Sequence, residues 1–141
     1  MEVILDASAI MAIILNESYR YNVIKLTENA MLLSPEVVSF EIGNALINLF
    51  KRGRISKEEL LEAYKNYSLI PLRLVNVDVQ KALKIACEHN ILACDAYYLE
   101  AAFRLKLPLI TFDQSMKRVG TKLRINILDK YAKRENEDEG L

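Results

Sequence analysis

Cysteine and histidine are scarce in this chain, with two cysteines and one histidine among 141 residues. A structural zinc site needs about four such ligands, so this sequence excludes a structural zinc site. One histidine without a serine elbow also argues against a catalytic triad. We expect Cys87 and Cys94 to be reduced, buried small side chains. His89 lies near a predicted helix end, where its ring can meet the last carbonyl groups.

Long apolar runs and charge of one sign are also missing. No apolar run reaches the roughly 18 residues of a membrane span, and no signal peptide precedes the first predicted strand. We therefore expect a cytoplasmic protein without a membrane partner. The 19 basic and 19 acidic residues give a formal net charge of zero, which argues against a strongly basic nucleic-acid binder as a whole.

Linkers are absent as well, because the chain has only four glycines and three prolines and no Ser-rich stretch. Its length and its 52% apolar content suffice for one domain with a real core. We predict a single domain over residues 1–130. Residues 131–141 hold two basic and four acidic residues, and this composition predicts a charged, flexible tail.

Short apolar runs alternate with helical patterns, which predicts an α/β fold with a mostly parallel sheet. Val3–Leu5 is the first predicted strand, and it leads through Asp6 into a helix over Ser8–Leu15. The other predicted strands, which bring the sheet to five, are Met31–Leu33, Pro71–Val77, Pro108–Asp113 and Ile125–Leu128.

Helix start and stop signals divide the rest of the chain. Ser34-Pro35-Glu36 predicts the start of a long helix that ends near Arg52, with Gly53 as its stop. Ser56 and Glu59 form a predicted capping box. The remaining predicted helices are Ser18–Asn29, Ser56–Tyr67, Asp78–Glu88, Ile91–Leu105 and a short one over Ser115–Val119.

Four acids stand at comparable places in this pattern. Asp6 and Asp113 end strands, and Asp95 opens a helix dominated by alanine, leucine and aromatics. Glu41 lies on the long helix, in a polar stripe with Asn44 and Asn48 at helical spacing. Each has a plain alternative: Asp6 and Asp95 could be helix caps, and the stripe could face water. Ser8 could cap its helix in place of Asp6.

Strand ends and the starts of following helices share one edge of a parallel sheet. Four carboxylates there would repel one another unless a cation lay between them. Oxygen ligands suit Mg²⁺ or Mn²⁺, and a metal that keeps its waters suits phosphate chemistry. Ser8, Asn44 and Thr111 are placed to hydrogen-bond the acids, waters or a phosphate oxygen.

Four motifs in order over residues 1 to about 128 resemble the PIN-domain ribonucleases, most closely VapC-type toxins. They are Leu5-Asp6-Ala7-Ser8, Phe40-Glu41-Ile42-Gly43-Asn44-Ala45-Leu46, Cys94-Asp95-Ala96-Tyr97-Tyr98-Leu99-Glu100-Ala101-Ala102 and Leu109-Ile110-Thr111-Phe112-Asp113. Many members carry serine or threonine where this chain has Leu92, which weakens the expected helix cap before Asp95.

The resemblance implies a three-layer α/β/α sandwich that pairs as a homodimer. It implies a metal site of Asp6, Glu41, Asp95 and Asp113 that holds Mg²⁺ or Mn²⁺, supported by Asn44 and Thr111. The implied activity is endoribonuclease cleavage of RNA by a metal-activated water, held off by a small antitoxin protein.

Other readings stay open at this point. A free-standing RNA-processing nuclease would have the same chemistry, and a non-catalytic interaction module could keep the fold. Ser8 stands where a phosphatase of the haloacid dehalogenase type needs its second acid, and a P-loop is absent. Two basic clusters could contact RNA or simply face water: Lys51, Arg52 and Arg54, and Lys117, Arg118, Lys122 and Arg124.

Overall fold

A parallel four-stranded sheet forms the centre of the computed structural model, which describes residues 1–128. The predicted tail over residues 131–141 lies outside the described residues. The strands are β1 (Glu2–Leu5), β2 (Met31–Pro35), β3 (Leu72–Val75) and β4 (Leu109–Ile110). Their order is β3-β2-β1-β4, and all three neighbouring pairs are parallel.

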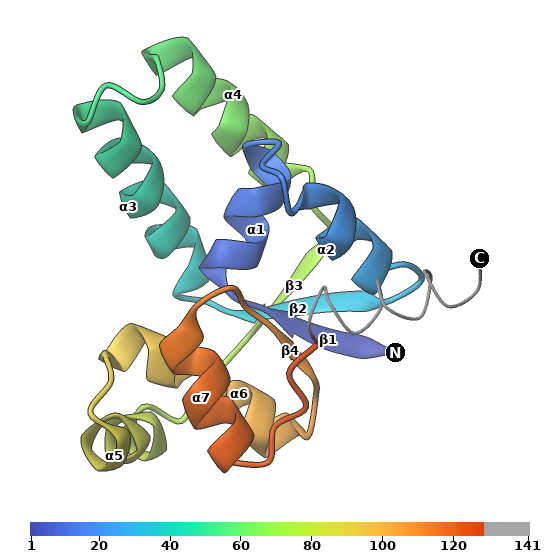
Figure 1. Cartoon of the computed structure of the whole chain (residues 1–141), viewed down its shortest axis with the longest axis vertical. Helices are drawn as coiled ribbons and strands as arrows, with labels where there is room; N and C mark the ends of the chain where they lie inside the picture. Colours follow the sequence, from blue (N-terminus) through green and yellow to red (C-terminus); the bar gives the residue numbers. More distant parts are fainter. Residues whose placement is uncertain (129–141) are drawn as a thin grey trace.

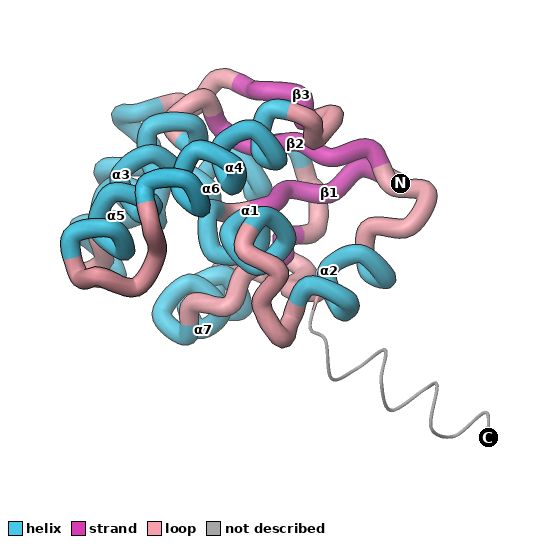
Figure 2. Tube along the Cα trace, turned by 90° about the horizontal axis from the view of Figure 1, so that it is seen from above, coloured by secondary structure: helices cyan, strands magenta, loops and turns pink. Residues whose placement is uncertain are grey.

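Helices cover both faces of this sheet. The seven helices of the described part of the chain are α1 (Ala7–Ile14), α2 (Arg20–Leu26), α3 (Val38–Lys51), α4 (Lys57–Ser68), α5 (Val79–His89), α6 (Ala93–Leu105) and α7 (Gln114–Lys122). Figure 1 shows α1–α4 on one side of the sheet and α5–α7 on the other, and Figure 2 gives the same molecule from above. The α/β/α sandwich implied by the resemblance is therefore confirmed.

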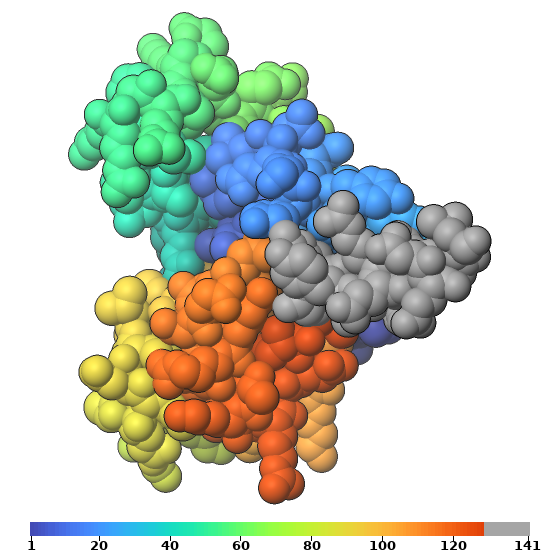
Figure 3. All heavy atoms as spheres, viewed as in Figure 1, coloured from blue at the N-terminus to red at the C-terminus, as the bar shows by residue number. Residues whose placement is uncertain are grey.

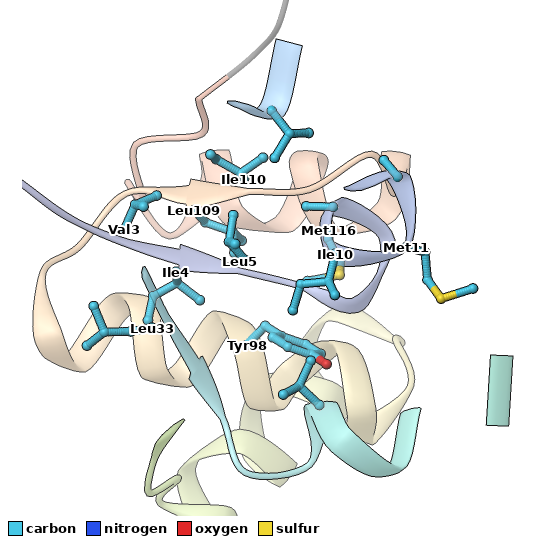
Figure 4. Close-up of a cluster of buried hydrophobic side chains, with 14 of the residues drawn as sticks. Val3, Ile4, Leu5, Ile10, Met11, Leu33, Tyr98, Leu109, Ile110 and Met116 are labelled. Carbon is cyan, nitrogen blue, oxygen red and sulfur yellow. The ribbon is translucent and has the colours of Figure 1, made fainter. Parts of the chain in front are cut away.

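The central strand β1 is buried on both faces, which explains its unbroken apolar sequence. Val3, Ile4 and Leu5 are each 0% exposed. Figure 4 shows side chains from both helical layers packed around them, including Ile10 of α1 and Met116 of α7. This packing fixes the position of the carboxyl end of β1.

The expected fifth strand is wrong. Within residues 1–128, Ile125–Leu128 contributes only an isolated parallel bridge between Leu109 and Ile127. Its partner β4 is itself only two residues long rather than the predicted Pro108–Asp113. The chain after Ile110 leaves the sheet because Thr111 and Asp113 are used in side-chain hydrogen bonds at the strand end.

The predicted start of the long helix at Ser34 is also wrong. Ser34 and Pro35 belong to β2, and α3 begins at Val38 without a side-chain cap. The buried Ser34 hydroxyl donates to the carbonyl oxygen of Leu5 at 2.8 Å. Pro35 pairs with Val75. These contacts between strands extend β2 past the proline that served as the helix signal.

Most other helix signals are confirmed. Ser56 and Glu59 form the capping box of α4, and Asp78 caps α5. Gly53 has a φ of 70° just after α3, as a helix stop requires. Leu92 gives α6 no side-chain cap. The helix predicted over Ser18–Asn29 is shorter than expected, since α2 covers Arg20–Leu26.

Two further expectations concern the cysteines and the membrane. Cys87 and Cys94 are exposed rather than buried, so that expectation is wrong. No helix within residues 1–128 has the length and apolar character needed to cross a bilayer.

Candidate active site

The four predicted acids lie at the carboxyl edge of the sheet, on four different connections. Asp6 directly follows β1, and Glu41 is in the first turn of α3, which follows β2. Asp95 is in the first turn of α6, and Asp113 caps α7 after β4. In Figure 3 the surface is indented at this edge, where the teal start of α3 faces the yellow part of the chain that leads into α6.

Asp6 is the most constrained of the four and is only 2% exposed. Its Oδ1 accepts hydrogen bonds from the Ser8 hydroxyl at 2.7 Å and from the Ala9 amide at 3.0 Å. Its Oδ2 accepts one from the Thr111 hydroxyl at 2.5 Å. Asp6 is therefore the helix cap of α1, and Ser8 donates to the acid rather than replacing it as a cap.

The segment after β4 is tied to the same cluster. The Asp113 amide donates to Thr111 Oγ1 at 3.0 Å, and the Phe112 amide donates to Ser8 Oγ at 3.0 Å. Asp113 Oδ1 accepts from the Met116 amide at 2.9 Å, which caps α7. These bonds fix Asp113 relative to Asp6 through Thr111 and Ser8, as their predicted supporting roles require.

Glu41 is held by a residue that the sequence did not single out. The buried Tyr98 of α6 donates from its hydroxyl to Glu41 Oε2 at 2.9 Å, and Figure 4 shows that hydroxyl at the edge of the apolar core. Tyr98 follows Asp95 by three residues, so it lies on the same helix face. That spacing was the available signal.

The other oxygen of Glu41 is buried and has no hydrogen-bond partner among residues 1–128. A buried carboxylate oxygen without a partner is costly unless a cation or water satisfies it. This atom therefore marks a position where the acid edge can accept a positively charged ligand.

The acids also affect one another electrostatically. Burial raises the pKa of Asp6 from 3.8 to about 6, opposed by its hydrogen bonds, and the charge of Asp113 adds to the rise. Burial, together with the charges of Asp113, Glu41 and Asp6, raises the pKa of Asp95 from 3.8 to about 6. The pKa of Asp95 thus responds to the charges of all three other acids.

Asn44 is the exception among the predicted supporting residues. It is exposed and makes no side-chain hydrogen bond to any of the four acids within the described chain. It lines a cleft of about 590 Å³ together with Glu41 and Cys94. Burial and the neighbouring Glu41 and Asp95 raise the pKa of the Cys94 thiol, so it stays protonated.

The residues present fit a divalent cation by their chemistry. Among residues 1–128, no three acid, cysteine or histidine side chains are arranged closely enough to surround one ion. The donor set is nevertheless all carboxylate, two of the four acids have raised pKa values, and a buried Glu41 oxygen has no partner. Hard oxygen ligands of this kind suit Mg²⁺ or Mn²⁺. Asp6, Glu41, Asp95 and Asp113 could hold such an ion.

Several solved structures have a similar fold. The chain is similar to PAE2754 from Pyrobaculum aerophilum, at 22% identity and a TM-score of 0.60 over 88% of this chain and 90% of that one. It is similar to VapBC2 from Rickettsia felis, bound to a promoter DNA fragment, at 18% identity and a TM-score of 0.60 over 92% and 98%. A toxin–antitoxin complex from Klebsiella pneumoniae matches at 16% identity and a TM-score of 0.51 over 79% and 86%.

At these identities the structural likeness shows a shared fold. Among curated proteins, none matches the chain. The sequence model of the PIN domain, however, matches residues 3–122, which is most of the chain and contains all four acids. The chain belongs to the PIN domain family.

Proposed function

We propose that this protein is a metal-dependent endoribonuclease that hydrolyses RNA phosphodiester bonds and acts as the toxin of a toxin–antitoxin pair. PIN domains are generally nucleases, and the family assignment supports an enzyme. The observation that supports the proposal most is the position of Asp6, Glu41, Asp95 and Asp113 at one edge of the sheet, where a buried Glu41 oxygen has no hydrogen-bond partner among residues 1–128. Such a cluster needs a cation, and a cation there suits phosphate substrates.

In this proposal some side chains bind the cation and others hold those side chains in position. Asp6, Glu41, Asp95 and Asp113 would hold the cation, Mg²⁺ or Mn²⁺. The chemistry that such an ion would supply is a water nucleophile at neutral pH and neutralisation of charge on the phosphate. Ser8 and Thr111 fix both oxygens of Asp6, and Tyr98 fixes one oxygen of Glu41. The burial of Asp6 excludes water from the side of the site that faces the core.

A groove on the α1–α4 side supports an antitoxin as the partner. Its apolar lining comes from Ile14, Leu15, Leu49, Ile55 and Ala63, and four glutamates line it as well: Glu17, Glu58, Glu59 and Glu62. The cavity volume is about 620 Å³. Such a groove fits an amphipathic antitoxin segment with basic residues beside its apolar ones.

A homodimer remains part of the proposal. Phe40 is 79% exposed on α3, where a second copy could cover it. Sedimentation of the purified protein tests this point directly. An RNA-processing nuclease remains the second candidate, since the same site would serve it.

Cleavage of a mixed RNA pool tests the enzyme. Purified protein is incubated with Mg²⁺ or Mn²⁺ and, separately, with EDTA, alongside Asp6→Asn and Asp78→Asn. Asp78 is a matched control because it also caps a helix but lies at α5, outside the acid cluster. We expect cutting by the unchanged protein and by Asp78→Asn only with metal, and none by Asp6→Asn.

Two results would contradict the proposal. Equal cutting by the unchanged protein and Asp6→Asn would mean that the activity comes from a contaminant. Cutting that persists in EDTA would remove the metal from the mechanism. A toxin and a processing nuclease are then distinguished by growth arrest on expression and its relief by the product of an adjacent small reading frame.

A further inference from the structure

A cavity of about 540 Å³ lies at the edge of the sheet opposite the acids. Two of its lining residues, Leu107 and Pro108, directly precede β4, whereas Asp113 follows that strand. The rest of its apolar lining includes Ala102, Phe103, Leu123 and Ile125. The charged side chains that line it are all cations: Arg104, Lys106 and Arg124. We call this space the basic cavity, and its lining fits a ligand that carries negative charge beside apolar groups.

Two of the three cations in the basic cavity are available to a ligand. Arg104 is already paired, because it donates to Glu100 Oε1 at 2.7 Å and to the carbonyl oxygen of Asn76 at 2.6 Å. Lys106 is the C-cap of α6, and Arg124 follows the end of α7. Both are exposed, and neither forms an ion pair within residues 1–128. A carboxylate in the cavity could therefore pair with either of them.

Three other cavities formed by residues 1–128 carry carboxylates instead. Glu36 lines one of them beside the end of β3, and Glu41 lines the cleft at the acid edge. Four glutamates line the groove between α1, α3 and α4. Carboxylates repel an acidic segment of polypeptide, whereas the cations of the basic cavity attract it. Among these four cavities, charge therefore favours the basic cavity for an acidic segment.

The chain itself contains an acidic segment a short distance further along the sequence. Residues 135–139, outside the described part of the chain, include four acids: Glu135, Glu137, Asp138 and Glu139. Asn126 lines the basic cavity, and Leu128 is the last described residue. Glu135 follows Leu128 by seven positions, and an extended chain of that length spans about 24 Å. The acidic segment is therefore near enough to turn back and reach the cavity.

We propose that the acidic segment 135–139 docks in the basic cavity of its own chain, where its carboxylates pair with Lys106 and Arg124. A single exposed ion pair contributes little free energy. The short tether, however, holds the segment at a roughly millimolar local concentration, so weak contacts suffice. Tyr131, on the tether, offers an apolar ring for the cavity wall. Lys106 lies about 17 Å along α6 from Asp95, so docking leaves the acid edge open.

Crosslinking of the full chain with a carbodiimide tests this proposal. The reagent joins a lysine amine to a carboxylate only where the two groups are in contact, and mass spectrometry identifies the linked peptides. The protein is an equal mixture of unlabelled chains and chains labelled with heavy nitrogen, which separates links within one chain from links between two copies. Lys51 and Lys81 serve for comparison, because both are exposed and neither lines the basic cavity.

We expect Lys106 to link to the acidic segment within one chain about five-fold more often than Lys51 or Lys81, as two exposed ion pairs predict. At about 1 M salt, where charges are screened beyond roughly 3 Å, this excess should disappear. Arg124→Gln should lower the yield at Lys106 about two-fold, as the loss of one pair predicts. Arg52→Gln, at the end of α3, makes the same charge change outside the cavity and should leave the yield unchanged. Thermal melting checks that both variants are folded.

Three outcomes overturn the proposal. They are a yield at Lys106 no higher than at Lys51 and Lys81, a yield in Arg124→Gln equal to that in Arg52→Gln, and links that form only between labelled and unlabelled chains. The last outcome would identify the occupant of the basic cavity as the acidic segment of a second copy. Because the experiment measures no cleavage, its result is independent of the proposed nuclease function.

Discussion

The hydroxyl of Tyr98 lies 2.9 Å from Glu41 Oε2 and donates a hydrogen bond to this oxygen. The two residues are on α6 and α3, the helices that begin at the acid edge from opposite layers of the sandwich. Burial and the charge of Glu41 raise the pKa of Tyr98 above its usual value, so the phenol stays a donor at all physiological pH values. The Tyr98 hydroxyl thus fixes one carboxylate oxygen of Glu41.

Tyr98→Phe removes this donor and keeps the ring in the core. Loss of a supporting hydrogen bond to a metal ligand commonly costs 10–100-fold in metal affinity or activity. We expect the Mn²⁺ concentration for half-maximal RNA cleavage to rise about 10-fold. Tyr97→Phe, one position away, is the control and should leave it unchanged. If Tyr98→Phe and Tyr97→Phe need the same Mn²⁺ concentration for half-maximal cleavage, the Tyr98 side chain only fills the core.

Thr111→Val replaces a buried hydroxyl with a methyl group of similar size. Asp6 Oδ2 loses its donor, and the Asp113 amide loses its acceptor. A buried group left without its partner costs about 1–3 kcal/mol, so the midpoint of thermal unfolding should fall. Because this hydrogen bond lowers the pKa of Asp6, the pH at which cleavage begins should move upward. Thr111→Ser keeps the hydroxyl and should restore both properties.

The pKa of Asp6 makes stability depend on pH in a definite direction. The pKa of Asp6 is about 6 in the folded protein, whereas its ordinary value is 3.8. The stabilising contribution of the protonated Asp6 is therefore complete below about pH 4 and is lost as the pH rises through 6. This difference corresponds to about 3 kcal/mol in the free energy of unfolding. Without metal, the protein should be less stable at pH 7 than at pH 5, and Asp95 adds to the effect.

The control for this measurement is Asp6→Asn, which keeps the shape of the side chain and cannot ionise. Its free energy of unfolding, from urea titrations in EDTA, should change less between pH 5 and pH 7 than that of the unchanged protein. A steeper loss in the variant would show that another group governs the dependence.

Divalent cations should reverse the loss of stability at pH 7. An ion that binds only the folded state stabilises it by about 2.7 kcal/mol at 100 times its dissociation constant. Mn²⁺ should therefore raise the unfolding midpoint of the unchanged protein, and Asp95→Asn and Glu41→Gln should reduce the rise. Asp78→Asn, outside the cluster, should respond fully. An equal rise in all of these variants would place the ion elsewhere.

The basic cluster after Asp113 should account for part of RNA affinity through phosphates. Replacing Lys117, Arg118, Lys122 and Arg124 with glutamine should weaken binding of a labelled RNA strand. It should also lower the slope of log affinity against log salt by about 0.7 for each phosphate that the protein no longer neutralises. The cluster of Lys51, Arg52 and Arg54, at the far end of α3 from Glu41, provides the comparison. An unchanged slope would count against the first cluster.

Local sequence determined most of the elements. The apolar run of β1, the capping box at Ser56 and the αL position of Gly53 were each readable, because they depend on residues within one turn or strand. The position of the four acids at one edge was readable too, since strand ends and helix starts share one edge in a parallel sheet. These features needed no knowledge of distant contacts.

Only the tertiary structure decided the remainder. Ser34 and Pro35 carry the signals of a helix start, but a bond to Leu5 and pairing with Val75 place them in a strand. Asp6 caps α1 with one oxygen, and its hydrogen bonds to Ser8 and Thr111 depend on the fold because Thr111 lies 105 residues further along the chain. Tyr98 gained its role from Glu41, 57 residues earlier. The contacts that decide these features join segments far apart in the chain. Local helix and strand propensities carry no information about such contacts.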